Sequence, residues 1–173
     1  MKMRHLVVAL LALGLAASMP APAFSQAKSD TIKIGAFLPM TGGVAAYGQG
    51  SWQGAQFARD MKPTILGKKV ELVLVDDKSD KIEAANAVTR LVEKEKVVAI
   101  IGSSISGNTL AGGPIAEKAG VPIVSPTATN PLVTQGKKYI FRVCFIDPFQ
   151  GEMAAKYAYE TLKKRKAALI IDK

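Results

Sequence analysis

Apolar residues from position 31 onward gather in short continuous runs, and segments with one apolar side lie between them. The runs predict strands over 32–38, 70–75, 97–101, 121–124, 139–143 and 167–171. The intervening segments predict helices over 49–61, 81–95, 109–119 and 149–164. Strands without polar alternation that are interleaved with helices favour a parallel sheet with helices on both faces. We therefore expect an α/β fold.

The first residues are typical of a targeting segment. A basic start precedes an apolar run over 6–17, which is shorter than the roughly 20 apolar residues of a membrane-spanning helix. Small residues and prolines follow, so we predict a secretory signal peptide over 1–27, with cleavage after Ala23 or Ala27. An N-terminal membrane anchor is the alternative. No other apolar run reaches membrane length, so we expect a soluble protein of the periplasm.

Composition excludes several kinds of chemistry. A single cysteine, Cys144, leaves no internal disulfide and no multi-cysteine zinc site. A single histidine, His5, argues against a histidine metal site and a Ser-His-Asp triad. We therefore predict that the protein is not an enzyme and has no catalytic residues, no metal site and no cofactor. Cys144 is expected to be a buried, inert thiol.

Charge adds little to the choice of partner. The formal net charge is +9, and one basic run occupies residues 163–166. This run lies where a helix is expected to end, and the helix dipole favours cations there. We therefore interpret it as a solvated helix end and expect no nucleic-acid partner. Asp76 and Asp77 are interpreted as solvated carboxylates at a strand end.

Ligands of parallel α/β sheets bind at the carboxyl ends of the strands. One such loop, residues 102–109, reads GSSISGNT and matches a phosphate-binding pattern except that Asn108 replaces the lysine. Without that cation, the loop retains hydroxyls and helix-start N–H groups, which suit a carboxylate. The alternative is that Ser106 or Asn108 only caps the helix.

Two other strand-end loops carry candidate binding groups. Residues 125–131 read SPTATNP, and their hydroxyls and backbone groups can serve both ends of a zwitterion. The alternative is a cluster of turn and capping residues. Tyr47, near the end of the loop over 39–48, is a candidate pocket wall, with ordinary packing as the alternative.

Several stretches, taken together, resemble a known family. They are IKIGAFLPMTGGVAAYGQG, ELVLVDDKSD, AIIGSSISGNT, AGVPIVSPTATNP and FRVCFIDPFQGEMAAKY. In order and spacing the chain is similar to the N-terminal half of the periplasmic branched-chain amino acid (Leu/Ile/Val) binding proteins of ABC transporters. The resemblance implies a type I periplasmic binding protein, or flytrap, fold of two lobes. Residues 28–142 would form an incomplete first lobe, and 143–173 the truncated start of the second.

The resemblance also implies residue roles. Ser106 would bind the ligand carboxylate through its hydroxyl and N–H, and Thr129 would contact carboxylate and ammonium. Thr127 would offer its carbonyl to the ammonium, and Ala128 would contribute backbone groups. Tyr47 would form a wall of the side-chain pocket.

The function implied is capture of an amino acid, with the branched-chain class favoured, and its delivery to a membrane permease of an ABC transporter. The protein is expected to act as a monomer. Two alternatives remain open, namely a ligand-sensing receptor domain of the same fold and an exported α/β enzyme.

Overall fold

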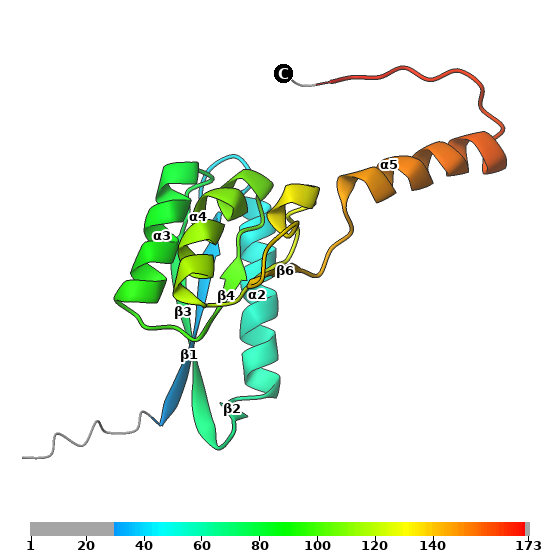
Figure 1. The fold of residues 1–173 in the computed structure, drawn as a ribbon. Coiled ribbons are helices and arrows are strands. Elements are labelled where there is room, and N and C mark those ends of the chain that lie inside the picture. The colour runs from blue at the N-terminus through cyan, green and yellow to red at the C-terminus, as the bar shows by residue number, and fades with distance from the viewer. Residues whose placement is uncertain (1–29, 172–173) are drawn as a thin grey trace, which may run out of the picture.

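The computed structural model of the chain describes residues 30–171, with the fold shown in Figure 1. The predicted signal peptide over 1–27 lies outside the described residues. The elements form a layered α/β structure built on one sheet of six strands, in the order β2-β3-β1-β4-β5-β6. These strands are β1 (Thr31–Leu38), β2 (Thr64–Ile65), β3 (Lys68–Asp76), β4 (Ala99–Gly102), β5 (Ile123–Ser125) and β6 (Ile140–Arg142).

Five of the six strands run parallel, which confirms the predicted sheet. β1 lies at the centre and pairs in parallel with β3 and β4. β5 and β6 extend the sheet beyond β4 in the same direction. The pattern did not predict β2, a two-residue strand that pairs antiparallel with β3 through a turn at Leu66 and Gly67. Only two residues pair here, which is too short a run to show periodicity.

Helices cover both faces of the sheet, as predicted. α3 (Lys81–Glu93) and α4 (Ser106–Ala119) lie side by side on one face, and α2 (Ala45–Met61) lies against the other (Figure 1). α4 passes without interruption through Pro114 and ends at Gly120, whose φ of 68° is the left-handed conformation typical of a helix C-terminus. α2 starts four residues before the predicted position, because residues 45–48, which were expected to end the loop over 39–48, are helical.

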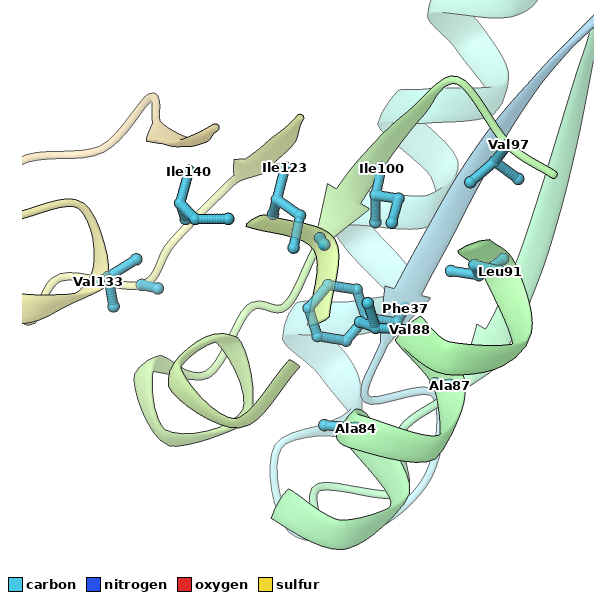
Figure 2. Close-up of a cluster of buried hydrophobic side chains, with 12 residues drawn as sticks. Phe37, Ala84, Ala87, Val88, Leu91, Val97, Ile100, Ile123, Val133 and Ile140 are labelled. Atoms are coloured by element: carbon cyan, nitrogen blue, oxygen red, sulfur yellow. The ribbon is translucent and has the colours of Figure 1, made fainter. Parts of the chain in front are cut away.

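The main core lies between the sheet and the α3–α4 pair (Figure 2). Phe37 from β1 is fully buried and is surrounded by aliphatic side chains from the two helices and from β4 to β6. The two helices approach closely at Gly112, where an added Cβ would come within 2.6 Å of Val88 Cγ2. The core is therefore aliphatic apart from this one phenylalanine, in line with the low aromatic content.

The C-terminal part differs most from prediction. The expected helix over 149–164 is α5 (Asp147–Lys156), which continues into one π-helical segment, η3 (Tyr157–Thr161). The predicted strand over 167–171 is wrong, because those residues are extended coil. Leu169, Ile170 and Ile171 are 90%, 100% and 80% exposed. A strand requires a hydrogen-bonded neighbour, and none of the described strands lies beside this segment.

Candidate functional site

A cleft of about 560 Å³ opens at the carboxyl ends of the parallel strands. Its walls come from the start of α2, the β4–α4 loop, the β5 loop and the segment that follows β6. The structure brings four of the five predicted site residues to this cleft, namely Tyr47, Ser106, Thr127 and Thr129. The remaining lining residues are Val44, Ser104, Ile105, Cys144, Phe145 and Gln150.

The β4–α4 loop presents a helix start to the cleft. α4 begins at Ser106, and no side chain caps it, so the interpretation that Ser106 or Asn108 only caps the helix is wrong. The first N–H groups of a helix have no partner within the helix, and they carry partial positive charge. The Ser106 hydroxyl accepts a 3.2 Å hydrogen bond from the Asn130 N–H, which leaves its own hydrogen free to be donated. This arrangement suits an anion such as a carboxylate.

The β5 loop is fastened to the β4–α4 loop. The Thr127 hydroxyl donates to the Ser104 carbonyl over 2.8 Å, which directs that hydroxyl into the protein. The Thr129 carbonyl accepts from the Asp147 N–H over 3.1 Å. The alternative interpretation as a turn and capping cluster holds for Asn130, whose side chain accepts from the Leu132 N–H at the short helix η2 (Pro131–Val133).

Ala128 is the one predicted site residue that does not line the cleft, and it is fully buried. Its N–H donates to the Ser125 hydroxyl over 3.1 Å. Its carbonyl accepts from Arg142 Nη1 over 2.9 Å. Both backbone groups of Ala128 are therefore engaged inside the protein, and its predicted contact with the ligand stays a prediction.

Tyr47 stands in the first turns of α2 and is 64% exposed on the cleft wall. The next residue, Gly48, is buried where α2 meets the end of β1. An added Cβ at Gly48 would lie 2.1 Å from the Pro39 carbonyl oxygen. The glycine thus allows the helix to approach the strand end closely, and that approach sets the position of Tyr47.

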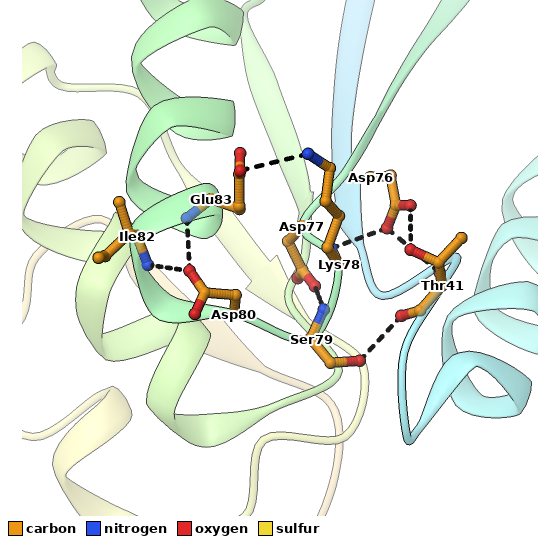
Figure 3. A network of polar contacts seen from close by, with 8 residues as sticks. All are labelled: Thr41, Asp76, Asp77, Lys78, Ser79, Asp80, Ile82 and Glu83. Carbon is orange, nitrogen blue, oxygen red and sulfur yellow. Dashed lines mark hydrogen bonds and ion pairs between the residues drawn. The ribbon is translucent and has the colours of Figure 1, made fainter.

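Figure 3 shows the polar network beneath these loops, around the carboxylates that end β3. Asp76 accepts hydrogen bonds from the Thr41 hydroxyl at 2.6 Å and from the N–H groups of Met40 and Lys78 at 2.9 and 2.8 Å. Partial burial raises the pKa of Asp76, but these hydrogen bonds outweigh it and lower the pKa below its ordinary value. The carboxylate therefore holds the loop that leads to α2.

Asp77 is fully buried, so the interpretation of both carboxylates as solvated is wrong for this residue. It accepts from the Ser103 hydroxyl at 2.5 Å and from the Ser79 N–H at 3.0 Å. The Ser103 carbonyl in turn accepts from the Ser125 hydroxyl at 2.7 Å. This buried chain of hydrogen bonds supports both binding loops. Sequence analysis missed it, although the paired acids after one strand and the serine after the next were a signal.

The segment after β6 also reaches the cleft. Phe145 and Gln150 line it, and they were not among the predicted site residues. Cys144 was predicted to be buried, but it is only half-buried and lies on the cleft wall. Only the placement of this segment after the strand over 139–143 could have indicated its role.

Two further findings concern residues 30–171 alone. Within that range, no group of three His, Cys, Asp or Glu side chains is gathered where it could hold a metal ion. Among the helices of the same range, none combines the length and the apolar character needed to cross a membrane.

The fold and cleft define a class of protein. It is an α/β lobe in which hydroxyls and a helix start surround a cleft for a small molecule at the carboxyl ends of the strands. The chain belongs to the periplasmic binding protein family, whose sequence model matches residues 31–173. This is a family of solute-binding proteins, and its type I fold confirms the predicted fold class.

Relatives make the likeness more specific. The leucine-specific-binding protein of Salmonella typhimurium is 38% identical over 162 residues, which are 91% of this chain and 44% of that protein. A leucine-binding protein LivK from Thermotoga maritima superposes with a TM-score of 0.74 and 57% identity, over 76% of this chain and 38% of its own. The isoleucine complex of LivJ from Streptococcus pneumoniae superposes with a TM-score of 0.73 and 42% identity, over 77% and 39%. The chain thus spans less than half of each of these proteins.

Proposed function

We propose that this chain is part of an exported solute-binding protein that captures an amino acid and delivers it to the permease of an ABC transporter. The single observation that carries the proposal is the cleft, in which Ser106 at a helix start faces Thr127 and Thr129 across one small space. The names of the relatives favour leucine, isoleucine or valine as the ligand. A signal peptide over 1–27 and lobes divided near residue 142 belong to the same proposal.

The head group of an amino acid fits the polar half of the cleft. Its carboxylate would lie at the start of α4, where the Ser106 hydroxyl and N–H can both donate to it. Its ammonium would donate hydrogen bonds to the Thr127 carbonyl and to the Thr129 hydroxyl oxygen. The Thr127 hydroxyl is already bonded to Ser104, so only the backbone of Thr127 is offered to the ligand.

The ligand side chain would lie on the apolar half of the cleft. Val44, which precedes α2, and Tyr47 in its first turn form that wall, and Phe145 adds a second aromatic ring from the segment after β6. Because Phe145 and Gln150 belong to the proposed second lobe, closure of the lobes about the hinge would surround the ligand. A zwitterion buried in this way needs every charge paired by hydrogen bonds.

A thermal-shift screen of the full-length gene product against the standard amino acids tests the proposal. A ligand at a thousand times its Kd stabilises the folded state by about 4 kcal/mol, which gives a clear rise in Tm. We expect this rise with leucine, isoleucine or valine. It should be lost in Ser106→Ala and Thr129→Ala and kept in Thr89→Ala, whose hydroxyl bonds the Ala85 carbonyl on α3, away from the cleft.

Two outcomes contradict the proposal. If no amino acid raises the Tm while an aromatic acid or another small anion does, the ligand class is wrong. If leucine raises the Tm equally in wild type, Ser106→Ala and Thr129→Ala, the ligand is bound elsewhere.

A further inference from the structure

Arg142, the last residue of β6, makes four hydrogen bonds to one short stretch of chain. Its Nη1 donates to the carbonyls of Ala128 and Asn130 over 2.9 and 2.8 Å. Its Nη2 donates to the Pro131 carbonyl over 2.9 Å and to the Thr134 hydroxyl over 2.6 Å. The guanidinium is thus surrounded by the loop over 128–134, which includes the proposed ligand contact Thr129.

The acceptors of Arg142 are all neutral. Among the ion pairs of the described residues, none includes Arg142. The planar guanidinium carries several N–H donors in a fixed arrangement, and lysine cannot reproduce that geometry. An arginine that binds only carbonyls and a hydroxyl acts by fixing the shape of the backbone around it rather than by pairing charge.

The backbone on either side of the guanidinium adds two further links to the ligand loops. The Val143 N–H donates to the Ser125 carbonyl over 3.2 Å, and the Asp147 N–H donates to the Thr129 carbonyl over 3.1 Å. The loop is also joined to the helix start of α4, since the Asn130 N–H donates to the Ser106 hydroxyl. Residues 142–147 therefore hold the loop that faces Ser106.

We propose that Arg142 is a positioning residue for ligand binding. It holds the loop over 128–134 so that Thr129 and Ser106 address the same ligand, and it ties that loop to the segment leading into α5. Movement of α5 is then transmitted to Thr129 through the Asp147 N–H. This inference rests on the proposed function for its ligand, but the ordering of the loop can be measured without any ligand.

The test uses the full-length protein with Arg142→Ala, Arg142→Lys and the milder Thr134→Val, which removes a single acceptor of the guanidinium. Arg90→Ala is the matched control, because Arg90 binds Glu95 on the exposed end of α3. Amide hydrogen exchange is recorded without ligand, and the Kd for leucine is measured by calorimetry.

We expect exchange at the Ala128 and Asn130 amides of Arg142→Ala to rise about tenfold or more, since several bonds from a charged donor are lost. Exchange at Leu91 in the core of α3 should stay unchanged, whereas a general loss of stability would accelerate both. The Kd for leucine should rise about tenfold or more, and millimolar guanidinium ion should partly restore it. Arg142→Lys should fall between Arg142→Ala and wild type, and Thr134→Val should show a smaller effect.

The results that overturn the inference are distinct from failure of the proposed function. If wild type binds leucine and Arg142→Ala binds it equally well, Arg142 does not position the site. If loop exchange in Arg142→Ala and Thr134→Val matches Arg90→Ala, the guanidinium does not order the loop. If wild type binds no amino acid but the loop exchanges faster in Arg142→Ala, the proposed ligand is wrong and the ordering role of Arg142 stands.

Discussion

The hydroxyl of Ser103 donates a 2.5 Å hydrogen bond to the carboxylate of Asp77, and both side chains are fully buried. Ser103 follows β4 and Asp77 follows β3, and these two strands flank the central strand β1. Because the Ser103 carbonyl also accepts from Ser125 at the end of β5, one serine connects three strand ends. The β4–α4 loop and the β5 loop, which both line the cleft, are therefore held by the same buried hydrogen bonds.

Removing the buried carboxylate should destabilise the fold strongly. Asp77→Ala leaves the Ser103 hydroxyl and the Ser79 N–H without their acceptor, so we expect a loss of about 3 kcal/mol in the free energy of unfolding. Asp77→Asn keeps one acceptor oxygen and should lose less. Urea denaturation of the three proteins measures these differences.

Asp80→Ala serves as the matched control for that series. Asp80 is exposed and caps α3 by accepting from the N–H groups of Ile82 and Glu83 at 2.8 and 3.0 Å. Loss of such a cap costs about 1 kcal/mol. Equal losses in Asp77→Ala and Asp80→Ala would show that burial of Asp77 adds nothing to its contribution.

Two glycines of α2 should respond to alanine in opposite directions. The Cβ of Gly48→Ala would meet the Pro39 carbonyl, so α2 must shift, and we expect a loss of about 2 kcal/mol. No atom lies within 4 Å of the Cβ position at Gly54, so Gly54→Ala should gain about 0.5–1 kcal/mol from better helix propensity. Thermal unfolding of both variants provides the comparison. A gain in Gly48→Ala would mean that α2 does not contact the strand end so closely.

The pKa of Asp76 predicts a loss of stability in acid. Its pKa is lowered in the folded state, so its contribution is fully present above the unfolded-state value, near 3.8, and is lost as the pH falls through the lower folded-state value. The stability advantage of wild type over Asp76→Asn should therefore shrink below a pH of about 4. Urea denaturation at a series of pH values measures this advantage.

Thr41→Val provides a check on the cause of that pH dependence. The Thr41 hydroxyl contributes most to lowering the pKa of Asp76, and the backbone N–H groups remain in the variant. Its stability should depend less on pH in the acid range than that of wild type. An unchanged acid profile would assign the effect to other carboxylates.

Local sequence patterns were sufficient for most of the fold. The apolar run over 32–38 predicted β1 (Thr31–Leu38). An aspartate followed three residues later by a glutamate, as at Asp80 and Glu83, is a pattern typical of a helix start, and Asp80 does cap α3. The glutamate of that pattern, Glu83, accepts a 3.2 Å hydrogen bond from Lys78 Nζ instead of bonding back to the cap. Patterns failed where tertiary contacts decide the outcome. Residues 167–171 have strand-like composition, but strand formation also needs a neighbouring strand, which composition does not report.

In the candidate site, too, local patterns predicted some residues, and contacts between distant parts of the chain decided the others. Hydroxyl-rich loops after parallel strands indicated where Ser106, Thr127 and Thr129 would lie, and the structure places them on one cleft. Asp77 and Arg142 were missed because their roles depend on partners distant in the sequence. Asp77 meets Ser103 26 residues later, and the pairing follows from strand order rather than from any local motif.

The cleft wall is built by the polar loops and by the start of α2, and these two parts differ in how well they should tolerate substitution. The polar loops are held by buried hydrogen bonds, whereas Val44 and Tyr47 are 37% and 64% exposed at the start of α2. Engineering of the cleft for a different ligand can therefore begin with a small library at these two positions. Gly48 should remain fixed in that library, since its close approach to Pro39 sets the distance between the α2 side of the cleft and the polar loops.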